Sequence, residues 1–325
     1  MTTTPPPPQA FQKSETDEVD GGLAPGTEGL QPKERKLSRL EKRAIAAKGR
    51  LSSPWASGIA IVLAVLWTIP TFGLLVTSFR PSADIRTNGW WNVFTQPSFT
   101  LDNYVNTLVT GSDPFIDYVV NTIVITLPSV VIPISLALLA AYAFAWIPFR
   151  GREVLFVAVF ALQIVPIQIT LIPLLTQYVN WGINGSFWPI WLSHSIFALP
   201  LAIFLLHNFM KDIPPSLVEA ARVDGAGHVK IFFRVLLPLL VPAIAAFGIF
   251  QFLWVWNDLL VALVFGSAAQ TRPLTVVLAE AAGVRGETWH LLSAGAFISM
   301  LIPVAVFLLL QRYFVRGLLA GSVKG

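Results

Sequence analysis

The chain has 325 residues, of which 54% are hydrophobic and 12% charged, and its mean hydropathy is +0.66. These values exclude an ordinary soluble globule and indicate a membrane protein. In a soluble protein the formal net charge of +4 would favour a nucleic-acid partner, but here the charges flank long uncharged tracts. We therefore expect contact with membrane lipid and none with nucleic acid. The chain has no cysteine, which excludes disulfides, thiolate metal sites and cysteine nucleophiles.

The N-terminal arm differs in composition from the rest of the chain. Residues 1–31 are rich in Pro, Thr, Gly and acidic residues, which predicts a disordered tail because too little apolar surface is available for burial. Residues 32–53 form a basic juxtamembrane segment, in which eight Lys or Arg accompany two Glu. We expect this segment at the membrane surface, ahead of a membrane domain over 54–325.

The uncharged tracts predict an all-α fold with six transmembrane helices. A helix needs about 20 apolar residues to cross a membrane, and its backbone polar groups must be satisfied internally in lipid. Prolines inside the tracts predict kinks rather than breaks, because neighbouring helices can satisfy the freed carbonyl groups. The predicted spans are 54–77, 118–145, 154–175, 187–209, 236–263 and 291–310. The prolines are Pro128, Pro133, Pro166, Pro173, Pro200 and Pro242.

The distribution of Lys and Arg predicts that both termini are cytoplasmic. The N-terminal arm, the loops at 150–152 and 211–234 and the C-terminal tail together carry 18 of these residues, whereas the opposite loops carry 4. Positive charge accumulates on the cytoplasmic side of multi-pass membrane proteins. The short loop that contains Gly182 and Gly185 is therefore expected on the outer side.

The longest expected cytoplasmic loop between spans, 211–238, begins with signals for a short helix. Pro214 and Pro215 suit a helix start, because a proline at the first helical position loses no hydrogen bond. Ser216 and Glu219 have the spacing of a capping box.

The same segment contains signals for the end of that helix. Gly225 and Gly227 are expected to stop it by adopting positive φ. A second helix is expected from about His228 into the fifth span. Ala220 and Ala221 would let another surface approach the helix backbone closely.

Few residues in the uncharged tracts are of the types that catalyse reactions or bind ligands. The chain has no GxxxxGK[ST] phosphate-binding loop, and its four His lack metal-binding spacing, so we expect no bound cofactor, no metal and no catalytic residue. A carboxylate at bilayer depth is costly, which makes Asp258 a candidate for a functional role. Asp258 and its neighbours Gln251, Trp254 and Asn257 are candidate residues of a substrate pathway. Gln251 as an interhelical hydrogen-bond partner and Trp254 as a membrane-interface residue remain alternatives.

One pattern in the segment 211–238 resembles a known motif. Glu219-Ala-Ala is followed by Gly225 after three residues and by Val235-Leu-Leu-Pro238 after nine more. This resembles the EAA motif of permease subunits in ABC importers, with Val235 where that family usually has Ile. The likeness extends over roughly 54–325 and implies an ABC importer permease fold. It also implies coupling to ATPase subunits through Glu219, Ala220, Ala221, Asp224, Gly225, Gly227 and Pro238.

Two further stretches narrow the resemblance. The stretch Phe252-Leu-Trp-Val-Trp-Asn-Asp258 and the Gly-rich tail 312–325 resemble the sugar permeases of the maltose-transporter type, in particular the MalG-like half of the pair. This implies an α-glucoside or a related oligosaccharide as substrate. In that family the tail reaches between the ATPase subunits, which implies such a role for Gly321, Ser322, Val323, Lys324 and Gly325.

The resemblance also implies the partners. They would be a second homologous permease, two ATP-binding cassette subunits that carry ATP and Mg, and an extracytoplasmic sugar-binding protein, to which the outer loop 266–287 extends. The chain would not be an enzyme by itself, and it would lie in the cell membrane of a prokaryote. The alternative is a secondary transporter driven by an ion gradient. That class requires ionisable residues at mid-membrane and an internal repeat, whereas Asp258 is the one carboxylate within the predicted spans and no repeat is evident.

Because the chain has no native cysteine, single introduced cysteines test the predicted topology. We predict that Gly185→Cys in intact cells reacts with a membrane-impermeant thiol reagent added from outside. Labelling of this variant only after the cytoplasmic side has been opened would contradict the predicted orientation.

Overall fold

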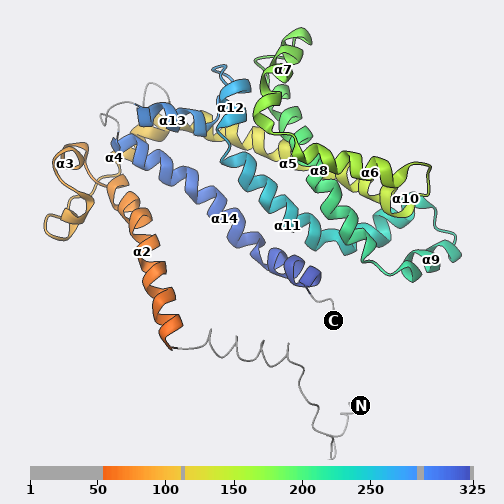
Figure 1. Ribbon diagram of the computed structural model, residues 1–325. Coiled ribbons are helices and arrows are strands. Elements are labelled where there is room, and N and C mark those ends of the chain that lie inside the picture. Colours follow the sequence, from red (N-terminus) through yellow and green to blue (C-terminus); the bar gives the residue numbers. More distant parts are fainter. Residues whose placement is uncertain (1–53, 111–113, 284–288, 323–325) are drawn as a thin grey trace, which may run out of the picture. The chain divides into compact units, whose positions relative to one another are not determined.

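The computed structural model describes residues 54–110, 114–283 and 289–322, and every regular element in these ranges is a helix (Figure 1). The predicted disordered tail and basic segment, 1–53, lie outside the described residues. The chain divides into two units at Leu66, and the first is described only over 54–65, the start of α2. Helix α2 spans Pro54–Ser78 and confirms the first predicted span.

Five helices in the described part are long and apolar enough to cross a membrane. A bent pair of helices adds a sixth if the pair counts as one span. The all-helical prediction is thus confirmed, although the last helix continues beyond its predicted end at 310. The five are α2, α5 (Phe115–Trp146), α8 (Trp188–Lys211), the run of α10 (His228–Ile231), η4 (Phe232–Leu236) and α11 (Leu237–Trp256), and α14 (Trp289–Ser322). The bent pair consists of α6 (Arg152–Ala161) with η3 (Leu162–Ile164), and α7 (Ile167–Asn180).

The third predicted span, 154–175, is broken rather than kinked. Its two parts meet at Pro166 with an angle of 99° between them. Pro166 has no N–H to continue the helix, and it restricts Val165, which adopts an extended conformation with φ −70° and ψ 119°. The expectation of a kink was wrong at this position. The other prolines lie inside helices as predicted: Pro128 and Pro133 in α5, Pro173 in α7, Pro200 in α8 and Pro242 in α11.

Helices α5 and α8 form the centre of the second unit, and α11 packs against both of them and against α14. Small residues occupy the contact: Ala137 and Ala141 of α5 and Ala202 of α8 are fully buried, and Ala198 is 4% exposed. In lipid, apolar surface alone does not drive helices together, so close van der Waals contact between small residues is needed. The α5–α8 pair is therefore the support on which the other helices rest.

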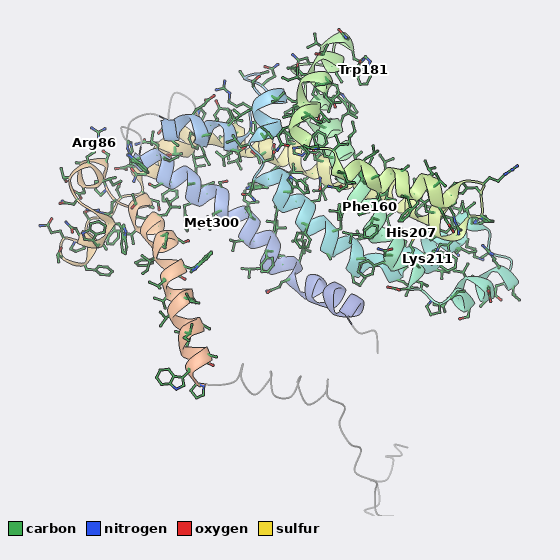
Figure 2. All side chains as sticks on the ribbon, in the orientation of Figure 1. Arg86, Phe160, Trp181, His207, Lys211 and Met300 are labelled. Carbon is green, nitrogen blue, oxygen red and sulfur yellow. The ribbon has the colours of Figure 1, made fainter. Side chains whose placement is uncertain are left out.

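Aromatic rings hold α6 against α8. Phe160 stacks on Phe204 with ring centroids 4.4 Å apart, and Phe156 lies 4.3 Å from the ring of His207. Figure 2 shows Phe160 and His207 along these two neighbouring helices. These contacts fix the first half of the broken span to the core, whereas the second half diverges after Pro166.

A compact segment that the sequence analysis did not predict lies between α2 and α5. Arg80 is 2% exposed, and its guanidinium donates to the carbonyl groups of Asn88 and Gly89 at 3.3 and 2.8 Å. The amide of Asn103 donates to the carbonyl groups of Ser78 and Arg80 at 3.0 and 2.7 Å. These side chains satisfy backbone groups that short helices leave unpaired. The segment comprises α3 (Ser82–Thr87), η1 (Trp90–Phe94), α4 (Asp102–Val105) and η2 (Asn106–Thr110).

The fifth predicted span, 236–263, ends early, at Trp256. Residues 257–259 interrupt the helix, and α12 (Leu260–Phe265) follows as a separate element. At its other end the helix starts at His228 as predicted, and the π-turn η4 lies just before Pro238. A π-turn accommodates a proline ring that would clash with the carbonyl four residues earlier. The expected outer loop 266–287 is partly helical, because α13 (Leu274–Gly283) forms within it.

Gly295 of α14 allows a close contact with α5. A Cβ at this position would lie 2.5 Å from Phe115 Cε2 and 2.9 Å from Leu278 Cδ2. We predict that Gly295→Ala lowers the free energy of unfolding by about 1–3 kcal/mol, because overpacking displaces buried side chains. Gly248→Ala is the matched control in α11, since its Cβ would lie 3.6 Å from Ile134 Cδ1. Equal melting temperatures of the two variants in detergent would contradict the close contact.

Candidate functional site

The segment between α8 and α10 is built around α9 (Pro215–Val223). This helix ends in a Schellman motif, in which Gly225 adopts φ +74° as predicted. The N–H of Ala226 donates to the carbonyl of Ala221, and the N–H of Gly225 donates to the carbonyl of Arg222, both at 2.9 Å. Glycine adopts this left-handed conformation without the penalty that a Cβ brings. The turn after α9 is therefore sharp and fixed by hydrogen bonds.

Two details of the predicted helix signals were wrong. Helix α9 starts at Pro215 after Pro214, so Ser216 is already inside the helix and forms no side-chain cap. The capping box with Glu219 is absent, because the proline at the first helical position sets the helix start instead. Gly227 has φ −75° and is the N-cap of α10, so only Gly225 of the two glycines needs positive φ.

One face of α9 is buried and the other is open. Val218 is 2% exposed, and with the half-buried Ala221 it packs into the core formed by α5 and α8. Glu219, Ala220 and Asp224 are exposed. Of these three expected coupling residues, Glu219 and Ala220 lie on a short helix that is anchored to the core, and Asp224 is its C-cap.

Tyr142, near the end of α5, joins this segment to the core. Its hydroxyl lies 2.7 Å from Nδ1 of His228, the first residue of α10. Its ring meets those of His228 and Phe232 edge to face, with centroids 6.0 and 5.4 Å away. Tyr142 is only 7% exposed, whereas His228 is exposed, so a partly buried bond attaches the start of α10 to α5.

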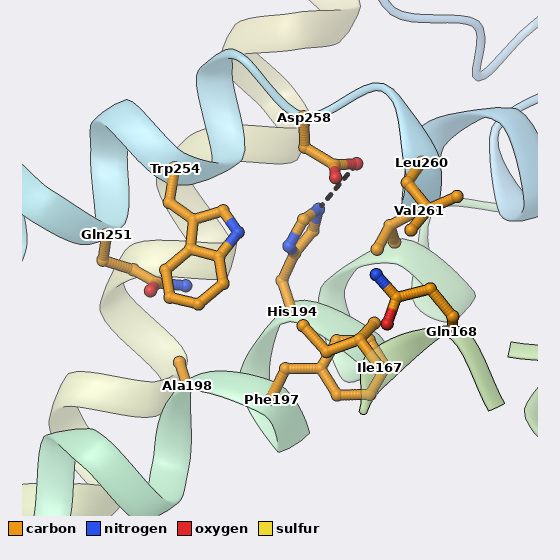
Figure 3. A pocket seen from close by; sticks show the side chains of 10 residues that line it. All are labelled: Ile167, Gln168, His194, Phe197, Ala198, Gln251, Trp254, Asp258, Leu260 and Val261. Carbon is orange, nitrogen blue, oxygen red and sulfur yellow. Dashed lines mark ion pairs between the residues drawn. The ribbon is translucent and has the colours of Figure 1, made fainter. Parts of the chain in front are cut away.

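A cavity of about 220 Å³ lies among α7, α8 and the junction of α11 with α12 (Figure 3). Its polar lining comes from Gln168 on α7, His194 on α8, Gln251 on α11 and Asp258 between α11 and α12. The indole of Trp254 forms another part of the wall. The remaining lining residues are apolar: Ile167, Phe197, Ala198, Leu260 and Val261.

His194 and Asp258 face each other in this cavity. His194 Nε2 lies 3.8 Å from Asp258 Oδ2, and the two side chains are 5% and 10% exposed. This distance is too long for a hydrogen bond, and the contact is an ion pair only when the imidazole is protonated. Asp258 Oδ2 also accepts a hydrogen bond from the N–H of Ala262 at 3.0 Å. Asp258 lies in the interruption between α11, which ends at Trp256, and α12, which begins at Leu260.

Three of the four predicted pathway residues meet at this cavity. Gln251, Trp254 and Asp258 line it. Asn257 does not line it; it is exposed, and its amide donates to the carbonyl of Leu253 at 2.7 Å. Helix α11 ends at Trp256, and Asn257 is its C-cap.

Gln251 also forms the interhelical hydrogen bond that the sequence analysis kept as an alternative. Its Nε2 donates to the carbonyl of Ser129 in α5 at 3.2 Å. The sequence analysis did not assign His194 and Gln168 to this site. The only signal in the sequence was that both are polar residues inside uncharged tracts. Their proximity to Gln251 and Asp258 could not be predicted, because they belong to helices remote in the chain.

The predicted tail residues are only partly described. The backbone of Gly321 and Ser322 belongs to the end of α14, whereas Val323, Lys324 and Gly325 lie outside the described residues. In the part of the chain that the structure describes, no three His, Asp or Glu side chains gather closely enough to hold a metal ion.

Comparisons with known proteins agree along most of the chain. Residues 118–319 match the family model of binding-protein-dependent transport system inner membrane components. The chain is 51% identical over 269 residues to the osmoprotective compounds uptake permease protein GgtD of Synechocystis sp., covering 81% of this chain and 90% of that protein. It is 47% identical over 262 residues to the alpha-glucoside transport system permease protein AglG of Rhizobium meliloti, covering 76% and 68%.

A solved structure shares the fold. A chain of a bacterial ABC transporter involved in the import of the acidic polysaccharide alginate matches with a TM-score of 0.66 and 22% identity. The match covers 86% of this chain and 99% of that one.

The contact between Tyr142 and His228 yields a prediction about local stability. Tyr142→Phe should increase hydrogen exchange of the backbone amides in 215–231 by about fivefold, because a hydrogen bond contributes about 1 kcal/mol. The matched control is Tyr178→Phe, which removes a buried hydroxyl bonded to Ser193 at 3.1 Å in another part of the core. Unchanged exchange in 215–231 would show that the bond does not hold the segment.

Proposed function

The chain belongs to the family of binding-protein-dependent transport system inner membrane components, and from this premise we propose that it is a permease subunit of an ATP-driven carbohydrate importer. The family membership confirms the resemblance found in the sequence, and the alternative of a secondary transporter is set aside. The protein is a multi-pass membrane protein, and we place it in the cell membrane of a prokaryote. It forms half of the translocation pathway.

The proposed assembly contains three other kinds of subunit. They are a second homologous permease, two cytoplasmic ATPases and an extracytoplasmic sugar-binding protein, and the family description itself names dependence on a binding protein. ATP and Mg bind to the ATPases, so this chain is a transport subunit and not an enzyme. We also propose that the C-terminal residues 321–325 reach the ATPase pair.

The observation that carries the coupling role is the exposed surface around α9 and α10. Val223, Val229 and Phe233 are 88%, 72% and 58% exposed, although they belong to the segment that buries Val218. A wide-open hollow of about 630 Å³ is lined by Val229, Phe233 and four other residues of 227–234. Val229 and Phe233 stand at the start of the candidate span His228–Trp256, so the exposure of Val223, outside that span, is the part of this surface that indicates a protein partner. Because the charge distribution predicts a cytoplasmic position, we assign this surface to an ATPase subunit.

The anchoring of α9 explains how the surface transmits movement. Val218 and Tyr142 attach α9 and α10 to α5 and α8, so a displaced α9 carries these helices with it rather than unfolding. ATP shifts the spans between inward-facing and outward-facing states only if the ATPase pair binds it with different affinity in the two states.

The substrate class follows from the relatives. One relative is an alpha-glucoside transport system permease protein and another takes part in the uptake of osmoprotective compounds, at 47% and 51% identity. We propose an α-glucoside or a related oligosaccharide as the substrate. Purification of the chain in mild detergent, followed by mass spectrometry, tests the assembly. Recovery without an ATPase subunit would contradict the proposed function.

Changes in α9 and in its turn should uncouple the transporter. We predict that Glu219→Lys and Gly225→Val each abolish sugar-stimulated ATP hydrolysis while the chain remains inserted in the membrane. Glu219→Lys reverses the charge of one exposed side chain on α9. Gly225→Val strains a residue at φ +74° by roughly 1–2 kcal/mol.

Gly182→Val is the matched control for the turn. Gly182 has φ +71°, and like Gly225 it would meet no atom within 4 Å if a Cβ were added. It lies outside the coupling segment, so this variant should keep sugar-stimulated hydrolysis. Normal hydrolysis by both α9 variants would contradict the coupling role, as would an equal loss in Gly182→Val.

A further inference from the structure

The cavity at His194 and Asp258 lies where two spans are interrupted. Ile167 and Gln168, the first two residues of α7, line one side, next to the break at Pro166. Leu260 and Val261, the first two residues of α12, line another side, next to the break at 257–259. Irregular backbone within a membrane protein is tolerated where it is buried in protein or lines a cavity.

The side chains of this cavity have the chemistry of a sugar site. A pyranose ring presents an apolar C–H face and a rim of hydroxyl groups that both donate and accept hydrogen bonds. Trp254 is 45% exposed and offers an indole face for the ring. Gln168, His194 and Asp258 supply amide, imidazole and carboxylate groups, which together provide donors and acceptors. Figure 3 shows these side chains around one space, with the imidazole beneath the carboxylate.

The gap between His194 and Asp258 fits one hydroxyl oxygen. At 3.8 Å the two polar atoms are too far apart to bond directly, whereas an oxygen about 2.8 Å from each would bond to both. The carboxylate is already partly compensated, because the N–H of Ala262 donates to it. This favours a neutral hydroxyl group over a cation as the ligand.

The size of the cavity limits the ligand to one ring. Its volume of about 220 Å³ lies below the roughly 300–1,000 Å³ of pockets that enclose a drug-sized molecule. A longer saccharide would therefore place one ring here at a time.

We propose that this cavity binds a single neutral hexose ring, so that this chain itself supplies a sugar subsite on the translocation pathway; the inference rests on the proposed function. Trp254 stacks on the ring, and Gln168, His194 and Asp258 bind its hydroxyl groups. Gln251, held by its bond to Ser129, closes the far wall.

Direct binding of sugar to the purified complex tests this subsite. The intact complex, without the binding protein, is incubated with radiolabelled maltose, both free of nucleotide and trapped with ATP and vanadate. Trp254→Ala should lower the retained maltose about fivefold through loss of stacking, and Gln168→Ala should lower it about threefold. Trp254→Phe keeps an aromatic face and should stay within about twofold of the wild type.

Gln163→Ala is the matched control for Gln168→Ala. Gln163 is also exposed and lies on the other side of Pro166, but it lines the adjoining, mostly apolar cavity and not the proposed site. It should retain wild-type binding. Unlabelled methyl α-D-glucopyranoside, a one-ring probe, should displace the maltose, whereas the acyclic sorbitol and the cationic choline should not.

Two kinds of failure are distinguishable. If the wild-type complex couples sugar to ATP hydrolysis but Trp254→Ala and Gln168→Ala bind maltose normally in both states, the subsite is refuted and the proposed function stands. Displacement by choline but not by methyl α-D-glucopyranoside would also refute a neutral-ring site. A complex without an ATPase partner would refute the proposed function itself.

Discussion

Backbone hydrogen bonding in an apolar surrounding is the constraint on which this structure depends. Each uncharged tract satisfies its N–H and C=O groups by becoming a helix, and a helix can stop only where other groups take over. The two interruptions at depth follow this rule. At Pro166 there is no N–H to satisfy, and after Trp256 the carboxylate of Asp258 accepts the N–H of Ala262 in α12. The cavity between the two breaks is thus a consequence of how the spans end.

Helices α5 and α8 connect the cavity with the segment 211–238 around α9. Near its C-terminal end, α5 holds α10 through Tyr142. Nearer its start, the carbonyl of Ser129 accepts a hydrogen bond from Gln251 of the cavity wall. Helix α8 carries His194 into the cavity and buries Met210 beside α9. A displacement of α9 would therefore act on α8, which lines the cavity, and on α5, which holds Gln251 of its wall. This arrangement fits the proposed role, in which the ATPases act on α9 and the sugar passes through the cavity.

The local signals of the sequence succeeded where one residue type decides the conformation. Gly225 adopts positive φ because only glycine does so without strain, and the turn after α9 follows from it. The start of α9 shows the opposite case: Ser216 and Glu219 have capping-box spacing, but Pro215 fixes the helix one position earlier. Both local signals were valid, but proline, whose φ is fixed, determined where the helix starts.

The sequence by itself determined that the chain is helical and membrane-embedded, because long uncharged tracts leave the backbone no other way to satisfy its polar groups. It also determined the family, since the spacing from Glu219 to Pro238 is local and complete. Only the tertiary structure decided that the third span breaks at Pro166 and that His194 and Gln168 join Gln251, Trp254 and Asp258 around one cavity. Hydropathy records which residues avoid water, whereas the angle of a broken helix and the partner of a polar side chain depend on neighbours distant in the chain.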